Sequence, residues 1–495
     1  MSDLSGAARD EVLARIDKVE ALRAEGTEPY PVEFARSATC AKLHERFADL
    51  EAGANTEETA TIAGRMMLRR DQGKLVFATL RDGTGEVQLF VSKGELGDDA
   101  FAAFRDLDLG DWVGATGTVM RTRKGELSVK VTHVQLLSKS LRPMPDKWHG
   151  LSDVDTRFRQ RYVDLMVNDD ARRIVEIRSA AVQSMRAHLL DLGYLEVETP
   201  VLQSVWGGAI ARPFTTHHNA LDTELFLRIA PELYLKRLIV AGLEKVFEIG
   251  RVFRNEGLST RHNPEFTMLE LYEAFVDYHV IAARTEDLIS GAAQAAIGTT
   301  KVEWGEHQID LTPPFRRAPI IELVREHAGV EMHPSMPVEE ARAICERFDI
   351  PWEPSWGSGK LLLEVYEKTT EHAIVNPTFV MDYPREVSPL ARVHRKDPEL
   401  TERFELIVGG REIANAFSEL NDPVEQRRRF EAQLRMAQVG DDEAQPVDED
   451  YIRALEYGLP PCGGLGIGID RVVMLIAGVT SIREVILFPH LRPEA

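Results

Sequence analysis

Hydrophobic and polar residues follow two different patterns along this chain of 495 residues. Between residues 60 and 137, short apolar–polar alternations separated by turn residues predict β-strands, and five strands of this length favour a small OB-fold barrel. Residues 8–25 have helical spacing that ends before Gly26. The predicted strands are Thr61–Leu68, Leu75–Arg81, Glu86–Ser92, Trp112–Met120 and Leu127–Leu136.

Longer helical patterns and longer strands begin near residue 157 and predict a large α+β domain. We therefore expect an N-terminal helical extension over residues 1–59, an OB-fold domain over 60–142, a linker over 143–156 and the α+β domain over 157–495. The chain contains no internal repeat and no low-complexity tract.

The barrel hairpin around residues 82–85 can be analysed by face. If Arg81 pairs with Glu86, one face is apolar and predicts core, while the other places Phe77 opposite Phe90 beside Gln88. Exposed rings among hydrogen-bonding groups suit single-stranded nucleic acid, whose bases stack on aromatic side chains. A hairpin covered by another domain is the equally weighted alternative.

The segment from Phe247 to Tyr272 predicts two strands joined by a polar loop. Period two puts Arg254 and Glu256 on one side of the first strand. It also gives the second strand a face bearing aromatic rings and a carboxylate, with leucines behind. Arginine suits a phosphate and a ring suits a purine, although a surface sheet with solvated charges gives the same pattern. The residues of the second face are Phe266, Met268, Glu270 and Tyr272.

Residues 463–475 are a glycine-rich strand that runs into a helix. Glycines let a ligand approach the backbone, and Arg471 lies near the helix start, where anions are favoured. A tightly packed structural strand would have the same composition. The spacing matches neither the dinucleotide-binding nor the Walker pattern.

A third cluster surrounds the hairpin signal Gly409–Gly410. Pairing Val408 with Arg411 puts Glu405 opposite Ala414 and makes Glu405 and Glu412 diagonal neighbours. Two such carboxylates repel unless a proton or cation lies between them, which points to Mg²⁺; two solvated acids are the simpler alternative. The same alternation sends Asn415, Phe417 and Glu419 to the opposite face, so a bulge or strand end must intervene if Glu419 joins the site.

Composition narrows the class of protein. The chain has 59 Lys+Arg and 80 Asp+Glu, giving −21, but residues 58–142 alone carry +2, so that segment differs from the acidic remainder. Three distant cysteines argue against a disulfide framework and a cysteine-based zinc site. No apolar run could span a bilayer and the N-terminus lacks a signal pattern, so a cytoplasmic protein without membrane association is expected.

These segments together resemble the signature motifs of class II aminoacyl-tRNA synthetases. Residues 193–200 resemble motif 1, residues 253–266 motif 2 and residues 466–471 motif 3. Three further strings resemble lysyl-tRNA synthetases, and the resemblance runs from about residue 60 to Pro493. It implies a homodimer with an anticodon-binding OB domain before an antiparallel-sheet catalytic domain, and tRNA(Lys), ATP and L-lysine as partners. The lysyl-type strings are Arg228–Lys236, Arg261–Tyr272 and Asn415–Asp422.

The resemblance also implies roles at the ATP site. Arg254 should contact the α-phosphate and the lysine carboxylate. Arg471 should bind the γ-phosphate and cover the adenine opposite Phe266. Glu405 and Glu412 should hold Mg²⁺ on the phosphates. The loop that closes on ATP should include Glu256, His262 and Asn263.

For the amino acid, the resemblance implies that Glu232, with the backbone near Gly208, takes the α-ammonium. The ε-ammonium should be held by Glu270, Glu419 and Tyr272. Asn415 and Phe417 should line this pocket, and Phe77 and Gln88 should contact the anticodon. Ala414 departs from the glycine common in relatives and would narrow the pocket slightly.

Four other classes of protein can be distinguished from a lysyl-tRNA synthetase by features of the sequence. An aspartyl or asparaginyl enzyme needs a cation for an aspartate side chain, whereas Glu270 and Glu419 are acids. A protein-lysylating paralogue lacks the barrel, and a lipid-lysylating fusion needs membrane spans. A non-catalytic nucleic-acid-binding protein would be expected to lose Arg254, Arg471 or the Glu405–Glu412 pair, and all of these are present.

Overall fold

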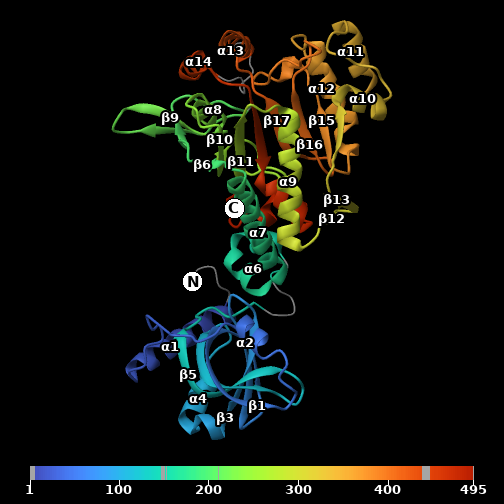
Figure 1. Ribbon diagram of the computed structural model, residues 1–495. Coiled ribbons are helices and arrows are strands. Elements are labelled where there is room, and N and C mark those ends of the chain that lie inside the picture. Colours follow the sequence, from blue (N-terminus) through green and yellow to red (C-terminus); the bar gives the residue numbers. More distant parts are fainter. Residues whose placement is uncertain (1–5, 146–150, 152, 210, 438–445, 494–495) are drawn as a thin grey trace. The chain divides into compact units, whose positions relative to one another are not determined.

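The computed structural model describes residues 6–145, 151, 153–209, 211–437 and 446–493 (Figure 1). The chain forms two compact units, residues 1–150 and 151–495. Part of the predicted linker 143–156 lies outside the described residues, and its last three residues already belong to helix α5 (Val154–Arg159).

The first unit contains a closed five-stranded barrel of order β1-β2-β3-β5-β4, as predicted. Only the β3–β5 pairing is parallel. The second and third strands have the predicted bounds, whereas the first is longer and begins at Asn55. The strands are β1 (Asn55–Asp71), β2 (Leu75–Arg81), β3 (Glu86–Ser92), β4 (Trp112–Arg121) and β5 (Leu127–Ser138).

The β2–β3 hairpin has the predicted register. Arg81 pairs with Glu86 and Phe77 with Phe90. The turn closes with Asp82 N–H donating to Gly85 O at 3.0 Å. The six apolar side chains of one face are at most 1% exposed, so this face forms the barrel core: Val76, Ala78, Leu80, Val87, Leu89 and Val91.

The N-terminal helix α1 (Gly6–Ala24) matches the predicted helix and packs on the barrel unit through charged groups. Arg15 donates to Ser140 O at 2.9 Å, and Lys18 pairs with Asp108 at 3.2 Å. The remaining helices of this unit are α2 (Cys40–Arg46), α3 (Lys93–Leu96) and α4 (Asp98–Asp106).

The second unit is built on an eight-stranded sheet of order β14-β15-β16-β17-β18-β11-β10-β6. Its pairings are antiparallel except β14–β15 and β10–β6. The strands are β6 (Leu195–Glu196), β10 (Lys245–Phe253), β11 (Glu265–Ala274), β14 (Arg316–Pro319), β15 (Thr378–Met381), β16 (Arg403–Ile407), β17 (Glu412–Ser418) and β18 (Cys462–Gly468).

The two faces of this sheet differ because its central strands alternate. Helices α7 (Asp169–Asp191), α9 (Tyr278–Ile297) and α15 (Ile469–Ala477) share one hydrophobic core with the inward residues, including the fully buried Leu269 and Leu271. The polar and aromatic residues of the same strands point away from that core. The opposite face therefore carries the chemistry.

Smaller elements surround the sheet. Helices α10 (Ile320–Ala328), α11 (Val338–Arg347) and α12 (Ser358–Thr369) have their own apolar cluster. Among the described residues, no helix is long and apolar enough to cross a membrane. The other elements are α6 (Arg161–Val167), β7 (Leu202–Gln203), β8 (Thr215–His218), β9 (Thr223–Leu227), α8 (Glu232–Val240), β12 (Lys301–Trp304), β13 (His307–Asp310), η1 (Glu371–Ala373), η2 (Arg385–Val387), α13 (Pro423–Ala437), α14 (Glu449–Glu456) and α16 (Ile482–Val485).

Candidate active site

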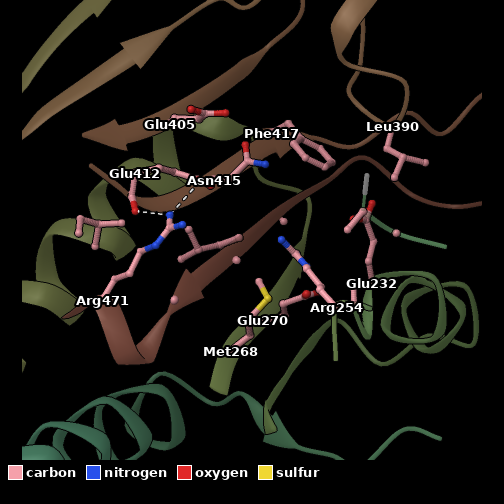
Figure 2. A pocket seen from close by; sticks show the side chains of 18 of the residues that line it. Glu232, Arg254, Met268, Glu270, Leu390, Glu405, Glu412, Asn415, Phe417 and Arg471 are labelled. Carbon is pink, nitrogen blue, oxygen red and sulfur yellow. Dashed lines mark hydrogen bonds and ion pairs between the residues drawn. The ribbon is translucent and has the colours of Figure 1, made fainter. Parts of the chain in front are cut away.

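A cavity of about 470 Å³ lies over the open face of the eight-stranded sheet. Every residue that the sequence assigned to ATP, metal or amino acid lines it. In Figure 2, Glu412 and Arg471 lie at one end, Glu232 at the other and Arg254 between them. The predicted residues on its wall are Gly208, Glu232, Arg254, Glu256, His262, Asn263, Phe266, Glu270, Tyr272, Glu405, Glu412, Asn415, Phe417, Glu419 and Arg471.

The β16–β17 hairpin corrects one predicted pairing. The Gly409–Gly410 turn forms as expected, with Val408 N–H donating to Arg411 O at 2.9 Å. Glu405, however, pairs with Asn415 rather than Ala414, because the register shifts between Leu406 and Ile407. The shift is a β-bulge that leaves consecutive residues Ile413 and Ala414 both buried, as opposed to alternating.

The bulge brings both predicted sets of β17 side chains to one face. Glu412 precedes it, while Asn415 and Phe417 follow it, yet all three line the cavity. Glu419, just beyond the strand end, lines it too. The sequence required a bulge or a strand end for Glu419 to join the site, and the bulge in β17 meets this requirement.

We call Glu405, Glu412 and Arg471 the hairpin end of the cavity. Glu405 accepts hydrogen bonds from Tyr383 Oη at 3.0 Å and Arg403 Nη2 at 2.6 Å. Burial raises the pKa of Glu405 to about 7, with Arg403 opposing the shift and the Glu412 charge adding to it. Burial also acts to raise the pKa of Glu412, but Arg471 and Arg254 outweigh it and the pKa lies below its usual value.

Two arginines supply positive charge to the cavity. Arg254 follows the last residue of β10, and its backbone N–H donates to Pro264 O at 2.9 Å. Its guanidinium lies 5.1 Å from the ring centroid of Phe266. Burial lowers the pKa of Arg254, partly offset by the charges of Glu412 and Glu256. The charge of Glu270 acts in the same direction, so acids from both ends of the cavity stabilise the charged form of Arg254.

The loop between β10 and β11 carries the other predicted ATP-site residues. Burial and the neighbouring Arg471 lower the pKa of His262, so its neutral form is favoured. Asn263 donates to Glu265 O at 2.5 Å and accepts from His490 N–H at 3.1 Å. The Asn263 amide therefore fixes the loop to the backbone on two sides.

We call Glu232, Glu270 and Glu419 the acidic end. Burial raises the pKa of Glu270 well above its ordinary value, and Glu232 adds to the shift. Burial raises the pKa of Glu419 to about 8, with Lys236 opposing. Tyr272 Oη donates to Glu270 at 3.4 Å. Three buried carboxylates at one end favour a ligand that brings positive charge.

Glycines make room for the acidic end. A Cβ added to Gly464 of β18 would meet Glu419 Oε1 at 2.0 Å and the Tyr272 ring at 2.5 Å. Gly208 has a φ of +89°, and a Cβ there would lie 3.0 Å from that of Glu232. The glycine-rich strand predicted near the C-terminus is thus the floor of the cavity.

The sequence assigned no role to several charged residues at the site, among them Arg403 and Lys236. Arg403 lines the cavity, contacts Glu405 and donates to Asn415 Oδ1 at 3.1 Å. It lies two residues before Glu405, so strand alternation could have identified it. Lys236 pairs with Glu232 at 2.5 Å and also with Glu419. Its spacing of four from Glu232 on a helix was the available signal.

On the predicted nucleic-acid face of the barrel, Phe77 and Gln88 differ in their exposure to solvent. Phe77 is half-buried and contacts Phe90 edge-on, with centroids 5.5 Å apart at 82°. Gln88 is only 7% exposed. Its amide donates to Ser128 Oγ at 2.9 Å and accepts from Arg70 at 3.4 Å. Phe77 is therefore the more accessible of the two.

Comparisons with known proteins agree with this geometry. The family described as "tRNA synthetases class II (D, K and N)" matches residues 153–492, and "OB-fold nucleic acid binding domain" matches residues 60–137. The lysine–tRNA ligase of Bacillus subtilis (strain 168) is 51% identical over 98% of this chain and 97% of its own. That of Xanthomonas campestris pv. campestris (strain 8004) is 54% identical with the same coverages.

The chain belongs to the class II tRNA synthetases of the D, K and N type. A third relative, the lysine–tRNA ligase of Trichormus variabilis, is 51% identical over 97% of this chain and 87% of its own. In this chain, the polar cavity lies on the face of the antiparallel sheet opposite the helices that share its hydrophobic core. The sequence resemblance and the geometry thus identify the same surface.

Proposed function

We propose that this protein activates L-lysine with ATP to lysyl-adenylate and transfers the lysyl group to the 3′ end of tRNA(Lys). One observation carries the proposal: a single cavity joins the three acids of the acidic end to Arg254 and Arg471. Lysine brings two ammonium groups, ATP brings phosphates, and the relatives are lysine–tRNA ligases at about half identity.

Each end of the cavity has a separate task. Glu232 binds the α-ammonium beside Gly208, and Glu270, Glu419 and Tyr272 bind the ε-ammonium. Asn415 and Phe417 line the pocket. A neutral side chain would bring no positive charge to Glu270 and Glu419, which supports discrimination.

Positioning and charge neutralisation carry the first step. The lysine carboxylate is already ionised near neutral pH, so it attacks the α-phosphorus without a general base, and the bond to the β-phosphate breaks to release pyrophosphate. Arg254 lies between the two ends of the cavity (Figure 2) and neutralises the pentavalent phosphate, while Arg471 binds the γ-phosphate. Phe266 and Arg471 enclose the adenine, and Glu256, His262 and Asn263 close over ATP.

Glu405 and Glu412 fit a divalent cation. The negative charge of Glu412 contributes to the raised pKa of Glu405. Carboxylates are hard oxygen donors, which suit Mg²⁺. No cluster of three or more metal-ligating side chains occurs among the described residues, so phosphate oxygens would complete the ligand set. When bound, Mg²⁺ supplies positive charge to the phosphates.

Residues 60–142 bind the anticodon through Phe77 and Gln88, residues 157–495 catalyse, residues 1–59 form the extension and 143–156 the linker. We also propose a cytoplasmic homodimer. ATP–pyrophosphate exchange with each of the twenty amino acids tests the function: lysine should support exchange best, and preference for aspartate or asparagine would overturn the assignment.

A further inference from the structure

A lysine of the protein itself lies behind the acidic end. Lys236, on α8, has a fully buried side chain. Its ammonium lies 2.5 Å from Glu232 Oε1 and is also paired with Glu419. The rings of Phe417 and Tyr272 lie 5.3 and 5.8 Å away. Glu232 and Glu419 are thus paired with Lys236 and also line the cavity.

Most of the titratable groups around Lys236 are acidic or neutral. Burial acts to lower the pKa of Lys236, but Glu232 and Glu419 outweigh it and the pKa lies well above its ordinary value. Lys236 is therefore a permanent cation. The titratable groups that face it or its two partners are Glu232, Glu270, Tyr272, Arg403, Glu419, Tyr451 and Cys462.

The charges of this region match a bound diamino acid. When a bound ligand keeps all three carboxylates ionised, they leave two negative charges against the Lys236 ammonium, and lysine offers two ammonium groups. Its single carboxylate is left for Arg254, while Arg403 is already paired with Glu405 at 2.6 Å. The positive and negative charges of the occupied site then balance.

We propose that Lys236 is a positioning and specificity-determining residue that fixes Glu232 and Glu419 and sets the acidic end to a net charge matching two ammonium groups. This inference rests on the proposed function. Without Lys236, Glu232 and Glu419 would lose the buried cation that both are paired with, and protonation of these acids would be favoured further.

The titration of Glu419 determines the direction in which lysine binding changes with pH. Burial raises the pKa of Glu419 to about 8, and the Lys236 ammonium limits that rise. An ionised Glu419 is needed to bind the ε-ammonium, so lysine binding should improve as pH rises from 6.5 towards 8. Losing Lys236 removes the opposing charge, so the improvement should move to higher pH.

The first test replaces Lys236 with methionine, which keeps length and removes charge. Lysine KM at pH 7 should rise roughly tenfold or more, because a buried carboxylate loses its charged partner. The KM for ATP should change little, and the pH profile should shift upward. Lys139→Met is the matched control, since Lys139 is also buried and pairs with Asp111 at 2.7 Å in the barrel.

A second test remains decisive if Lys236→Met alone does not fold. In a Glu419→Gln background the acidic end has one charge too few, so adding Lys236→Met should lower lysine KM relative to Glu419→Gln alone. A merely structural lysine predicts further loss when the two changes are combined. Further loss in the double variant, or an unchanged lysine KM and pH profile in folded Lys236→Met, would overturn the inference.

Measurements on the unmodified enzyme test the proposed function, and measurements on the Lys236 variants test the role of Lys236. If the unmodified enzyme shows no lysine-dependent pyrophosphate exchange, the proposed function is wrong whatever the Lys236 variants do. If it shows that exchange and the variants keep its lysine KM, only the role of Lys236 is wrong.

Discussion

Arg471 and Glu412, which are 59 residues apart in sequence, meet through two hydrogen bonds. Arg471 Nη1 donates to the main-chain oxygen of Glu412 at 2.7 Å and to its carboxylate Oε2 at 3.1 Å. The contact ties the first turn of α15 to the bulged hairpin strand β17. The arginine proposed to bind phosphate and the acid proposed to bind metal are thereby held as one unit.

Replacing Glu412 with glutamine tests this end of the cavity. The carboxylate charge is lost while the main-chain bond to Arg471 can persist. Losing one charged interaction, about 1.5–3 kcal/mol, should raise the Mg²⁺ concentration needed for half-maximal pyrophosphate exchange roughly tenfold or more. Glu303→Gln, on the exposed part of β12, is the control. An unchanged Mg²⁺ titration would reject the metal role.

Replacing Glu270 with glutamine tests the acidic end. Glu270 is 4% exposed and lies beside Tyr272 Oη at 3.4 Å, so an amide keeps its shape without its charge. Lysine KM should rise roughly tenfold or more, with the KM for ATP little changed. A lysine KM equal to the parent value would exclude Glu270 from the pocket.

A methyl group on the cavity floor should be more damaging than its size suggests. Gly464→Ala would drive its Cβ to 2.0 Å from Glu419 Oε1, so Glu419 and Tyr272 must shift. We expect lysine KM to rise by about two orders of magnitude, because small displacements of positioned groups are costly. Gly291→Ala, in α9 with its nearest neighbour 3.9 Å away, is the matched control and should leave exchange intact.

The barrel can be tested separately from the catalytic sheet. Phe77→Ala should reduce tRNA charging by roughly one to two orders of magnitude, since base stacking contributes about 1–3 kcal/mol per base. Lysyl-adenylate formation without tRNA should persist. Equal loss of both half-reactions with a lowered melting temperature would contradict the anticodon role.

A core variant of the same barrel gives the contrasting result. Phe104 is fully buried, and Phe104→Ala should cost about 3–5 kcal/mol of barrel stability. Thermal or urea unfolding of both variants distinguishes a lost stacking platform from a lost core residue.

Local rules were sufficient for much of this protein. The β2–β3 register, its buried apolar face and the glycine strand leading into a helix follow from period-two alternation and turn residues, which act over a few positions. The same rules identified the faces of β11, because Leu269 and Leu271 must be buried while Glu270 must not face that core.

Tertiary structure decided what alternation could not. The bulge at Ile413–Ala414 breaks period two, and only packing of both side chains into the core makes that break favourable, so Glu412 and Phe417 reach one face. Lys236 shows the same limit: its helix spacing predicts a pair with Glu232, but its second partner, Glu419, is 183 residues away in sequence. Sequence therefore determined which residue types carry the chemistry, and long-range packing determined which of them meet, because burial energies depend on neighbours that no local pattern contains.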